Sequence, residues 1–281
     1  MLISYAMPTI SATSITGAGW LTSDGAAALY DGKPARRARL QWAAGDTLDS
    51  FVKITLSFTT ATPLRVLALL GTTLPAGVRV DFLGAGGDGL GGTCDNARTV
   101  AMPDGTTAAW AIARANDPAE TGVEVRIYND CNGATWATTG TVVDLGEVWA
   151  GPAVVAGIRD GWDVQTIDPG DFSRTRGGQL SATRRSAYRV LAASFAGLSA
   201  AAVRGEGLAN GMDMDKIAAA LRGGARCAVV PHYRNLSTRE LDPQAIARSA
   251  IYGYASQIPN AANISRGYFT GQLMVDEIPA A

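Results

Sequence analysis

The chain has 281 residues, of which 47% are hydrophobic and only 17% are charged. This composition can bury hydrophobic cores, so it excludes a chain that is disordered throughout, and the length favours two domains over one. The 24 basic and 25 acidic residues nearly cancel, so no net field attracts nucleic acid or an anionic membrane.

The first residues, Met1 to Met7, lack the basic start and sustained apolar run of a signal peptide, and no later apolar stretch reaches the length of a membrane span. We therefore expect a protein made in the cytoplasm, without membrane insertion. The three cysteines, Cys94, Cys131 and Cys227, are odd in number and lack CxxC spacing. This favours reduced thiols over a disulfide framework.

The first half of the chain is predicted to be all β, because turn-forming residues interrupt it at short intervals. The clearest strand covers residues 52–58, where Val52, Ile54 and Leu56 alternate with polar residues. Further strands are predicted at residues 64–70, 78–82, 110–114, 123–128 and 142–149. A sheet with so many strands avoids unpaired edges by folding into a sandwich, jelly roll or barrel. We expect a mainly β chain with an N-terminal jelly-roll-like β-sandwich at residues 1–155.

A glycine-rich run from Gly84 to Asn96 separates two of these strands and offers little side chain to bury. We expect it to form an exposed loop at one end of the sandwich, near the turn around Gly133. Asp88 and Asn96 in this loop, together with Trp136, are the candidate ligand-binding residues. The Trp136 indole would stack on a sugar ring if it is exposed, whereas core packing is the ordinary role of tryptophan.

After Gly161 the sequence changes in character, and residues 156–281 are predicted to form a smaller α+β docking domain. Short helices are expected near residues 198–203, beginning at Ser199, and at 216–222, where aspartates precede the helix and glycines follow it. Strands are expected at residues 188–191, 227–230 and 268–275.

Five arginines lie close together at the start of this second domain: Arg174, Arg176, Arg184, Arg185 and Arg189. Planar guanidinium groups pair well with carboxylates, so we interpret the cluster as a subunit interface. A solvated surface and a phosphate-binding patch are the alternatives. Nucleic acid is disfavoured, because only Tyr188 interleaves with the arginines and the chain is nearly neutral.

No catalytic, metal or cofactor motif is recognisable. The single histidine, His232, follows Pro231 at the end of a predicted strand and has no Gly-x-Ser-x-Gly element to pair with. Cys94 and Cys131 lack the further ligands of a metal site. Whether a pair of carboxylates could cleave a glycoside depends on their separation in space. We therefore expect no enzymatic activity and no cofactor.

Two groups of segments resemble known families. Residues 30–34, followed by Arg39 and Trp42, are similar to the start of galactose-binding-like (discoidin-type) sandwiches, where a turn precedes a strand carrying arginine or tryptophan. Residues 146–152, 176–178, 185–191 and 267–277 resemble patterns in tail-tip and minor tail proteins of bacteriophages, and together they span much of residues 140–281.

This resemblance implies a structural component of a bacteriophage virion, in the tail or tail tip. Such a subunit would assemble with copies of itself into a ring or adaptor, contact other virion tail proteins, and present the sandwich toward host surface glycans. The resemblance implies no catalytic residues. A carbohydrate-binding module without catalysis is the alternative, and a glycan hydrolase is a more distant one.

Overall fold

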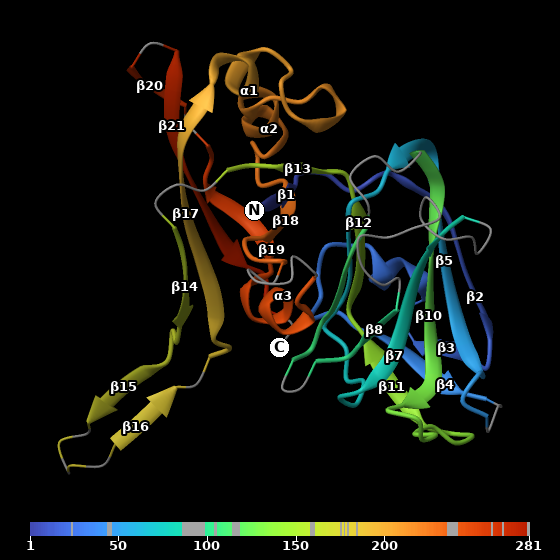
Figure 1. Cartoon of the computed structure of the whole chain (residues 1–281). Coiled ribbons are helices and arrows are strands. Elements are labelled where there is room, and N and C mark those ends of the chain that lie inside the picture. Colours follow the sequence, from blue (N-terminus) through green and yellow to red (C-terminus); the bar gives the residue numbers. More distant parts are fainter. Residues whose placement is uncertain are drawn as a thin grey trace. The chain divides into compact units, whose positions relative to one another are not determined.

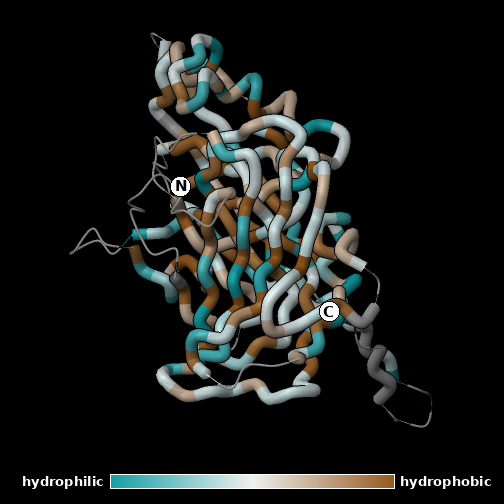
Figure 2. The backbone as a smooth tube through the Cα atoms, turned by 90° about the vertical axis from the view of Figure 1, so that its right-hand side faces the viewer, coloured by the Kyte–Doolittle hydropathy of each residue, from teal (hydrophilic) through white to brown (hydrophobic). Residues whose placement is uncertain are grey.

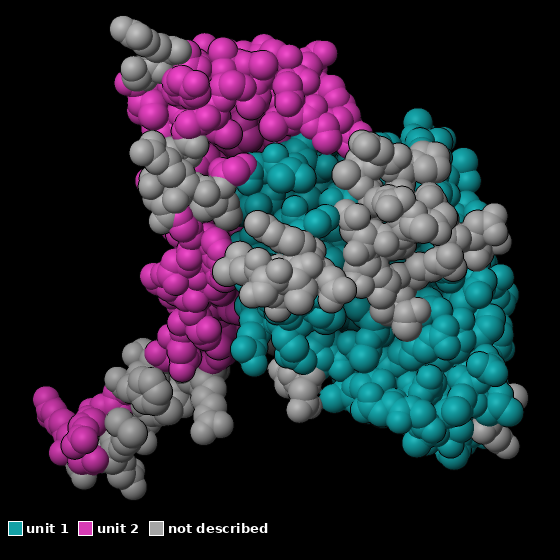
Figure 3. Space-filling view, viewed as in Figure 1, with its two compact units in different colours: residues 1–156, 228–250, 280 teal, residues 157–227, 251–279, 281 magenta. Residues whose placement is uncertain are grey.

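The computed structural model describes residues 1–23, 25–43, 47–85, 99–103, 106–113, 119–157, 161–174, 176, 178, 180–183, 185–234, 241–259, 261–265 and 267–279. Over these residues the chain is mainly β and its strands pair in antiparallel ladders, which confirms the predicted class. The chain divides into two compact units (Figure 3). The first contains residues 1–156 and 228–250, and the second contains residues 157–227 and 251–279.

One layer of the sandwich in the first unit is a sheet with the strand order β2-β5-β10-β7-β8. The central strands β5 and β10 pair along most of their length, with Val125 opposite Ile54 and Ile127 opposite Val52. The bounds of the strands are Ile10–Gly17 for β2, Phe51–Pro63 for β5, Val78–Gly84 for β7, Thr99–Ala101 for β8 and Ala119–Cys131 for β10.

The second layer combines two ladders, β11-β4-β3 and β12-β6-β9. Gly146 alone separates β11 from β12, and its amide donates to the carbonyl of Leu70 at 3.0 Å. A side chain at Gly146 would collide with the carbonyl oxygen of Pro34. The bounds are Gly19–Ser23 for β3, Ala38–Trp42 for β4, Val66–Leu70 for β6, Ala109–Ile112 for β9, Val142–Leu145 for β11 and Glu147–Gly151 for β12.

The core of the first unit lies between these layers and follows from the period-two pattern of the strands. β5 buries Val52, Ile54, Leu56 and Phe58 and leaves the intervening residues partly exposed, as the sequence predicts. Opposite them β4 buries Ala38, Leu40 and Trp42. Figure 2 shows the alternation of hydrophobic and hydrophilic residues along the strands. Each buried Val or Leu side chain stabilises the fold by about 1.5–3 kcal/mol.

The remainder of the first unit joins segments that are far apart in the sequence. β1 (Leu2–Ser4) pairs with β13 (Ala153–Val155) and, on its other edge, with β18 (Arg226–Val230). α3 (Pro243–Ser249) follows, capped by the Asp242 carboxylate, which accepts from the amides of Gln244 and Ala245. The short 3-10 helix η1 covers Ala26–Leu29.

The division into units therefore differs from the expected one. The first break lies after Ala156, one residue beyond the expected one, and residues 228–250 belong to the first unit instead of to an uninterrupted domain at 156–281. The physical reason is the pairing of β18 with β1 and the packing of α3 against β9.

The second unit is built on the long strands β17 (Tyr188–Ser199) and β21 (Tyr268–Glu277), which pair along most of their length. β14 (Trp162–Ile167) pairs with β17, whereas β19 (Ile251–Gln257) and β20 (Ala262–Ser265) pair with β21. α1 (Ala200–Arg204), the 3-10 helix η2 (Ala209–Gly211) and α2 (Met214–Ala220) follow β17. Both predicted helices are present. The expected Ser199 side chain caps α1, and Asp213, one of the aspartates that precede the second predicted helix, caps α2.

Candidate functional site

The most unusual part of the second unit is the end of its sheet, which we call the arm. It consists of the edge strand β14, which pairs with β17, and beyond them the two-stranded hairpin of β15 (Asp171–Arg174) and β16 (Leu180–Thr183). β17 pairs with β21 on its other side, so β14 is the last strand of a larger sheet. In Figure 1 this hairpin lies beyond the ends of β14 and β17 and away from α1 and α2 of the same unit. None of the β14 side chains, all of which the structure describes, is buried.

The arm carries most of the arginines that the sequence singled out. Arg174 ends β15, Arg176 follows it, and Arg185 precedes β17; all three are exposed. Arg184 lies outside the residues that the structure describes. The structure therefore places exposed guanidinium groups near both strands of the hairpin, where a partner's carboxylates could reach them.

Arg189 differs from the other arginines because an acid of its own chain already binds it. Its guanidinium makes an ion pair with the Glu277 carboxylate, and its backbone amide donates to the same carboxylate at 2.9 Å. The pair joins β17 to the end of β21 within the second unit. It thus stabilises the base of the arm, a role that the sequence pattern did not separate from that of the other four arginines.

Trp136, the candidate sugar-stacking residue, packs inward. Its indole nitrogen donates to the carbonyl of Tyr128 at 2.8 Å, and its ring meets the buried ring of Trp42 edge-on with 5.6 Å between centroids. The side chain of Asn129 holds the same turn, because it accepts from the amides of Trp136 and Ala137. These contacts give Trp136 the core-packing role that was the alternative interpretation.

The other two candidate ligand residues, Asp88 and Asn96, lie outside the described residues, as does the predicted loop beyond Ala85. Gly84 itself ends β7. Cys94 also lies outside them. Cys131 and Cys227 are free thiols, and burial raises the pKa of Cys227 to about 12.

The structure assembles no evident chemical centre among the residues it describes. The ring nitrogen Nε2 of His232 lies 2.8 Å from the carbonyl oxygen of Arg234, and in the described part of the chain no three of His, Cys, Asp and Glu gather as a metal site would require. No helix in the described ranges is long and apolar enough to cross a membrane.

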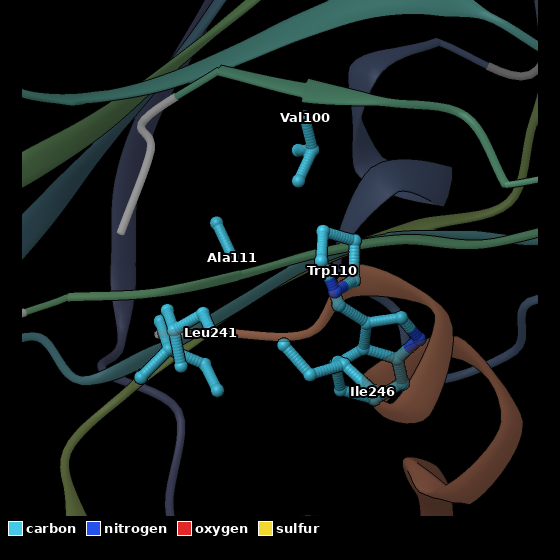
Figure 4. A pocket seen from close by; sticks show the side chains of 7 residues that line it. Val100, Trp110, Ala111, Leu241 and Ile246 are labelled. Carbon is cyan, nitrogen blue, oxygen red and sulfur yellow. The ribbon is translucent and has the colours of Figure 1, made fainter. Parts of the chain in front are cut away.

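A small hollow lies in the first unit where α3 packs near β8 and β9 (Figure 4). Trp110 and Ile246 face each other there, and no charged side chain lines it. Its lining consists of Val100, Trp110, Ala111, Ile112, Leu241, Pro243 and Ile246. An apolar seam of this kind offers packing, and none of its lining side chains is ionisable.

Sequence reasoning missed one exposed cluster on the sandwich. Trp20 of β3 is 49% exposed, and it lies across from Gln41 of β4 in the sheet register. The alternation of apolar and polar residues at 38–42 could have predicted this exposed face. It buries Leu40 and Trp42 and turns Arg39 and Gln41 outward.

Comparison of the sequence with models of known protein families and with curated proteins finds no match.

Proposed function

We propose that the chain is a non-catalytic structural subunit of a bacteriophage virion, in the tail or tail tip, and that it assembles with copies of itself through the arm. The observation that carries this proposal is the arm itself, because its edge strand β14 buries none of its side chains and so gains little from its own fold. The virion setting rests on the resemblance of four short segments between residues 146 and 277 to patterns in tail-tip and minor tail proteins.

The β15–β16 hairpin of the arm is energetically incomplete by itself. A two-stranded hairpin is at best marginally stable in water and needs a third strand or a packed face. β14 ends the strand order of its sheet, which leaves it with backbone groups that another strand can pair with. Trp162 on β14 is 38% exposed, and Val164 and Ile167 are half-buried. A neighbouring copy that covers this strand would bury these side chains and complete its hydrogen bonds.

The charge of the arm favours a protein partner with carboxylates. The exposed Arg174, Arg176 and Arg185 would pair with acids of the next copy, and arginine is enriched in protein interfaces. A closed ring requires that two different surfaces meet between neighbours, as they do when a projecting arm reaches the body of the next subunit.

Charge reversal on the arm tests this proposal. The full chain should exceed the monomer mass of 29.1 kDa in multi-angle light scattering, and the double variant Arg174→Glu/Arg185→Glu should shift the distribution toward monomer. Arg222→Glu is the matched control. Arg222 is exposed in the same unit, but it follows α2 in the sequence and does not belong to the arm. A wild-type chain that stays monomeric at high concentration and is not found in purified virions contradicts the proposal.

A further inference from the structure

The outer face of the β3-β4-β11 ladder in the first unit carries a row of side chains from each of its strands. Trp20 lies opposite Gln41, and Gln41 lies opposite Val142. Side chains directly opposite each other on antiparallel strands point to the same face, with Cβ atoms about 5 Å apart. Trp20 is 49% exposed and Val142 is 46% exposed, so the row presents an indole to solvent instead of to the core.

A polar pair lies beside this row on the same face. Arg39 lies opposite Asp144, two positions along β4 from Gln41. Its Nε donates to one carboxylate oxygen at 2.8 Å and a terminal nitrogen donates to the other at 3.2 Å. These hydrogen bonds lower the pKa of Asp144. The two charges neutralise each other, and Arg37, whose charge also lowers the pKa of Asp144, adds one positive charge nearby.

We propose that this face binds a sugar ring of a neutral glycan, with the Trp20 indole stacked on the ring and Gln41 and the Arg39–Asp144 pair bonded to its hydroxyl groups. This site lies on a sheet face and is distinct from the strand-end loops where the sequence placed its candidates. The proposal goes beyond the assembly function and holds whether or not the arm joins copies of the chain.

The chemistry of the cluster matches a pyranose. One face of such a ring exposes aliphatic C–H groups, which suit an aromatic surface, while the hydroxyl groups at its rim both donate and accept hydrogen bonds. The Gln41 amide donates and accepts, and the Asp144 carboxylate has lone pairs beyond those that Arg39 uses. Nucleic acid would need several cations free to bind phosphates along its backbone, whereas Arg39 is already bound to Asp144.

The size of the face also favours a small ligand over a second protein. Five residues along a strand and a ladder of β3, β4 and β11 span an area of about 17 Å by 14 Å, or roughly 240 Å². A stable protein interface buries about 800 Å² on each partner. One or two sugar rings cover the available area.

On the outer face of the other layer, aromatic rings are covered by arginine side chains of the same chain. On the β5-β10-β7 sheet the guanidinium of Arg79 lies 4.0 Å from the ring of Tyr128, and that of Arg126 lies 4.9 Å from the ring of Phe51. Tyr128 is accordingly only 7% exposed. Trp20, at 49%, keeps a surface that a ligand can cover.

The backbone holds Trp20 in place before any ligand binds. The chain passes from β2 to β3 within a single residue, Ala18, whose amide donates to the carbonyl of Phe51 and whose carbonyl accepts from the amide of Ala43. Gly17 adopts φ +94°, and a side chain there would collide with the carbonyl oxygen of Phe51. A strand fixed at this point loses little entropy when a ligand binds.

Titration of the full chain with neutral saccharides tests the site. The probes are methyl β-D-glucopyranoside, methyl β-D-galactopyranoside, cellotetraose and chitotetraose, followed by saturation-transfer NMR and tryptophan fluorescence. We expect saturable binding of at least one probe. Trp20→Ala should raise its Kd at least tenfold, Gln41→Ala should raise it severalfold, and Trp162→Ala, which removes the exposed indole of the arm, should leave it unchanged.

Three outcomes would overturn the proposal: no saturable binding of any probe, an equal loss in Trp20→Ala and Trp162→Ala, or a change of mass in Trp20→Ala that reveals a contact between copies. If Trp20→Ala does not fold, the comparison of Gln41→Ala with wild type decides the question. Failure here leaves the light-scattering result of the arm variants untouched, so the two proposals are tested separately.

Discussion

Replacing Trp136 by alanine distinguishes the packed indole of the structure from an exposed, ligand-stacking one. The substitution removes the edge-on contact with Trp42 and the hydrogen bond to the carbonyl of Tyr128. We expect a clear loss of stability in the first unit, because both contacts lie inside the sandwich.

The magnitude follows from the contacts. Truncation of a fully buried Phe or Trp costs about 3–5 kcal/mol, and the partial exposure of Trp136 reduces this to about 2–3 kcal/mol. A unit of this size then melts about 5–10 °C lower. Trp136→Phe keeps an aromatic ring but leaves the Tyr128 carbonyl without the indole donor, and it should cost about 1 kcal/mol.

Urea unfolding followed by fluorescence and circular dichroism measures both variants. Trp20→Ala is the matched control, because its half-exposed ring on the outer face should contribute less than about 1 kcal/mol. A Trp136→Ala protein whose unfolding midpoint equals that of wild type would refute the core role and restore the interpretation of Trp136 as a surface residue.

Three further predictions concern single positions. Gly17→Ala should destabilise the first unit by at least about 2 kcal/mol, because the residue has φ +94° and no room beside the Phe51 carbonyl; a variant as stable as wild type in urea would show that this corner relaxes. The Asp144 carboxyl should titrate by NMR below its ordinary pKa of 3.8, and Arg39→Gln should return it toward that value. The stabilisation from this pair is therefore present above the ordinary pKa and is lost as the pH falls through the folded pKa, and an unshifted Asp144 would argue against the pair. The Cys227 thiol, buried and with its pKa raised to about 12, should resist alkylation in the native protein and react after unfolding, and rapid native labelling would contradict its burial.

The strands of the core could be predicted from the sequence because each has a buried face. Val52, Ile54 and Leu56 alternate with polar residues in β5, and all five residues of β6 are buried, as the apolar run at 64–70 predicts. β4, at Ala38–Trp42, was not among the strands predicted from the hydrophobic pattern, although it buries Ala38, Leu40 and Trp42. The predicted strand at 142–149 is divided into β11 and β12, because Gly146 changes the hydrogen-bond partner.

The elements that sequence reasoning missed lack such a pattern. β14 buries none of its side chains, so no hydrophobic periodicity marks it. α3 carries a helix-start signal in Asp242 and Pro243, but the same pair is also typical of turns, and the helix is only seven residues long. The pairing of β18 with β1 joins residues more than two hundred positions apart, which no local pattern encodes.

The candidate site was predictable only in part for the same reason. The arginine cluster was visible as a composition shift, but only the structure separates the internally paired Arg189 from the exposed Arg174, Arg176 and Arg185. Exposure likewise decides between tryptophans. Residue type alone cannot distinguish the inward Trp136 from the outward Trp20.

Electron cryomicroscopy of the purified assembly tests the central claim most directly. The account predicts a particle that contains several copies, in which β14 and the β15–β16 hairpin of each copy lie against the neighbouring copy. A particle whose copies meet elsewhere while the arms extend into solvent, or a monodisperse monomer at micromolar concentration, would contradict it.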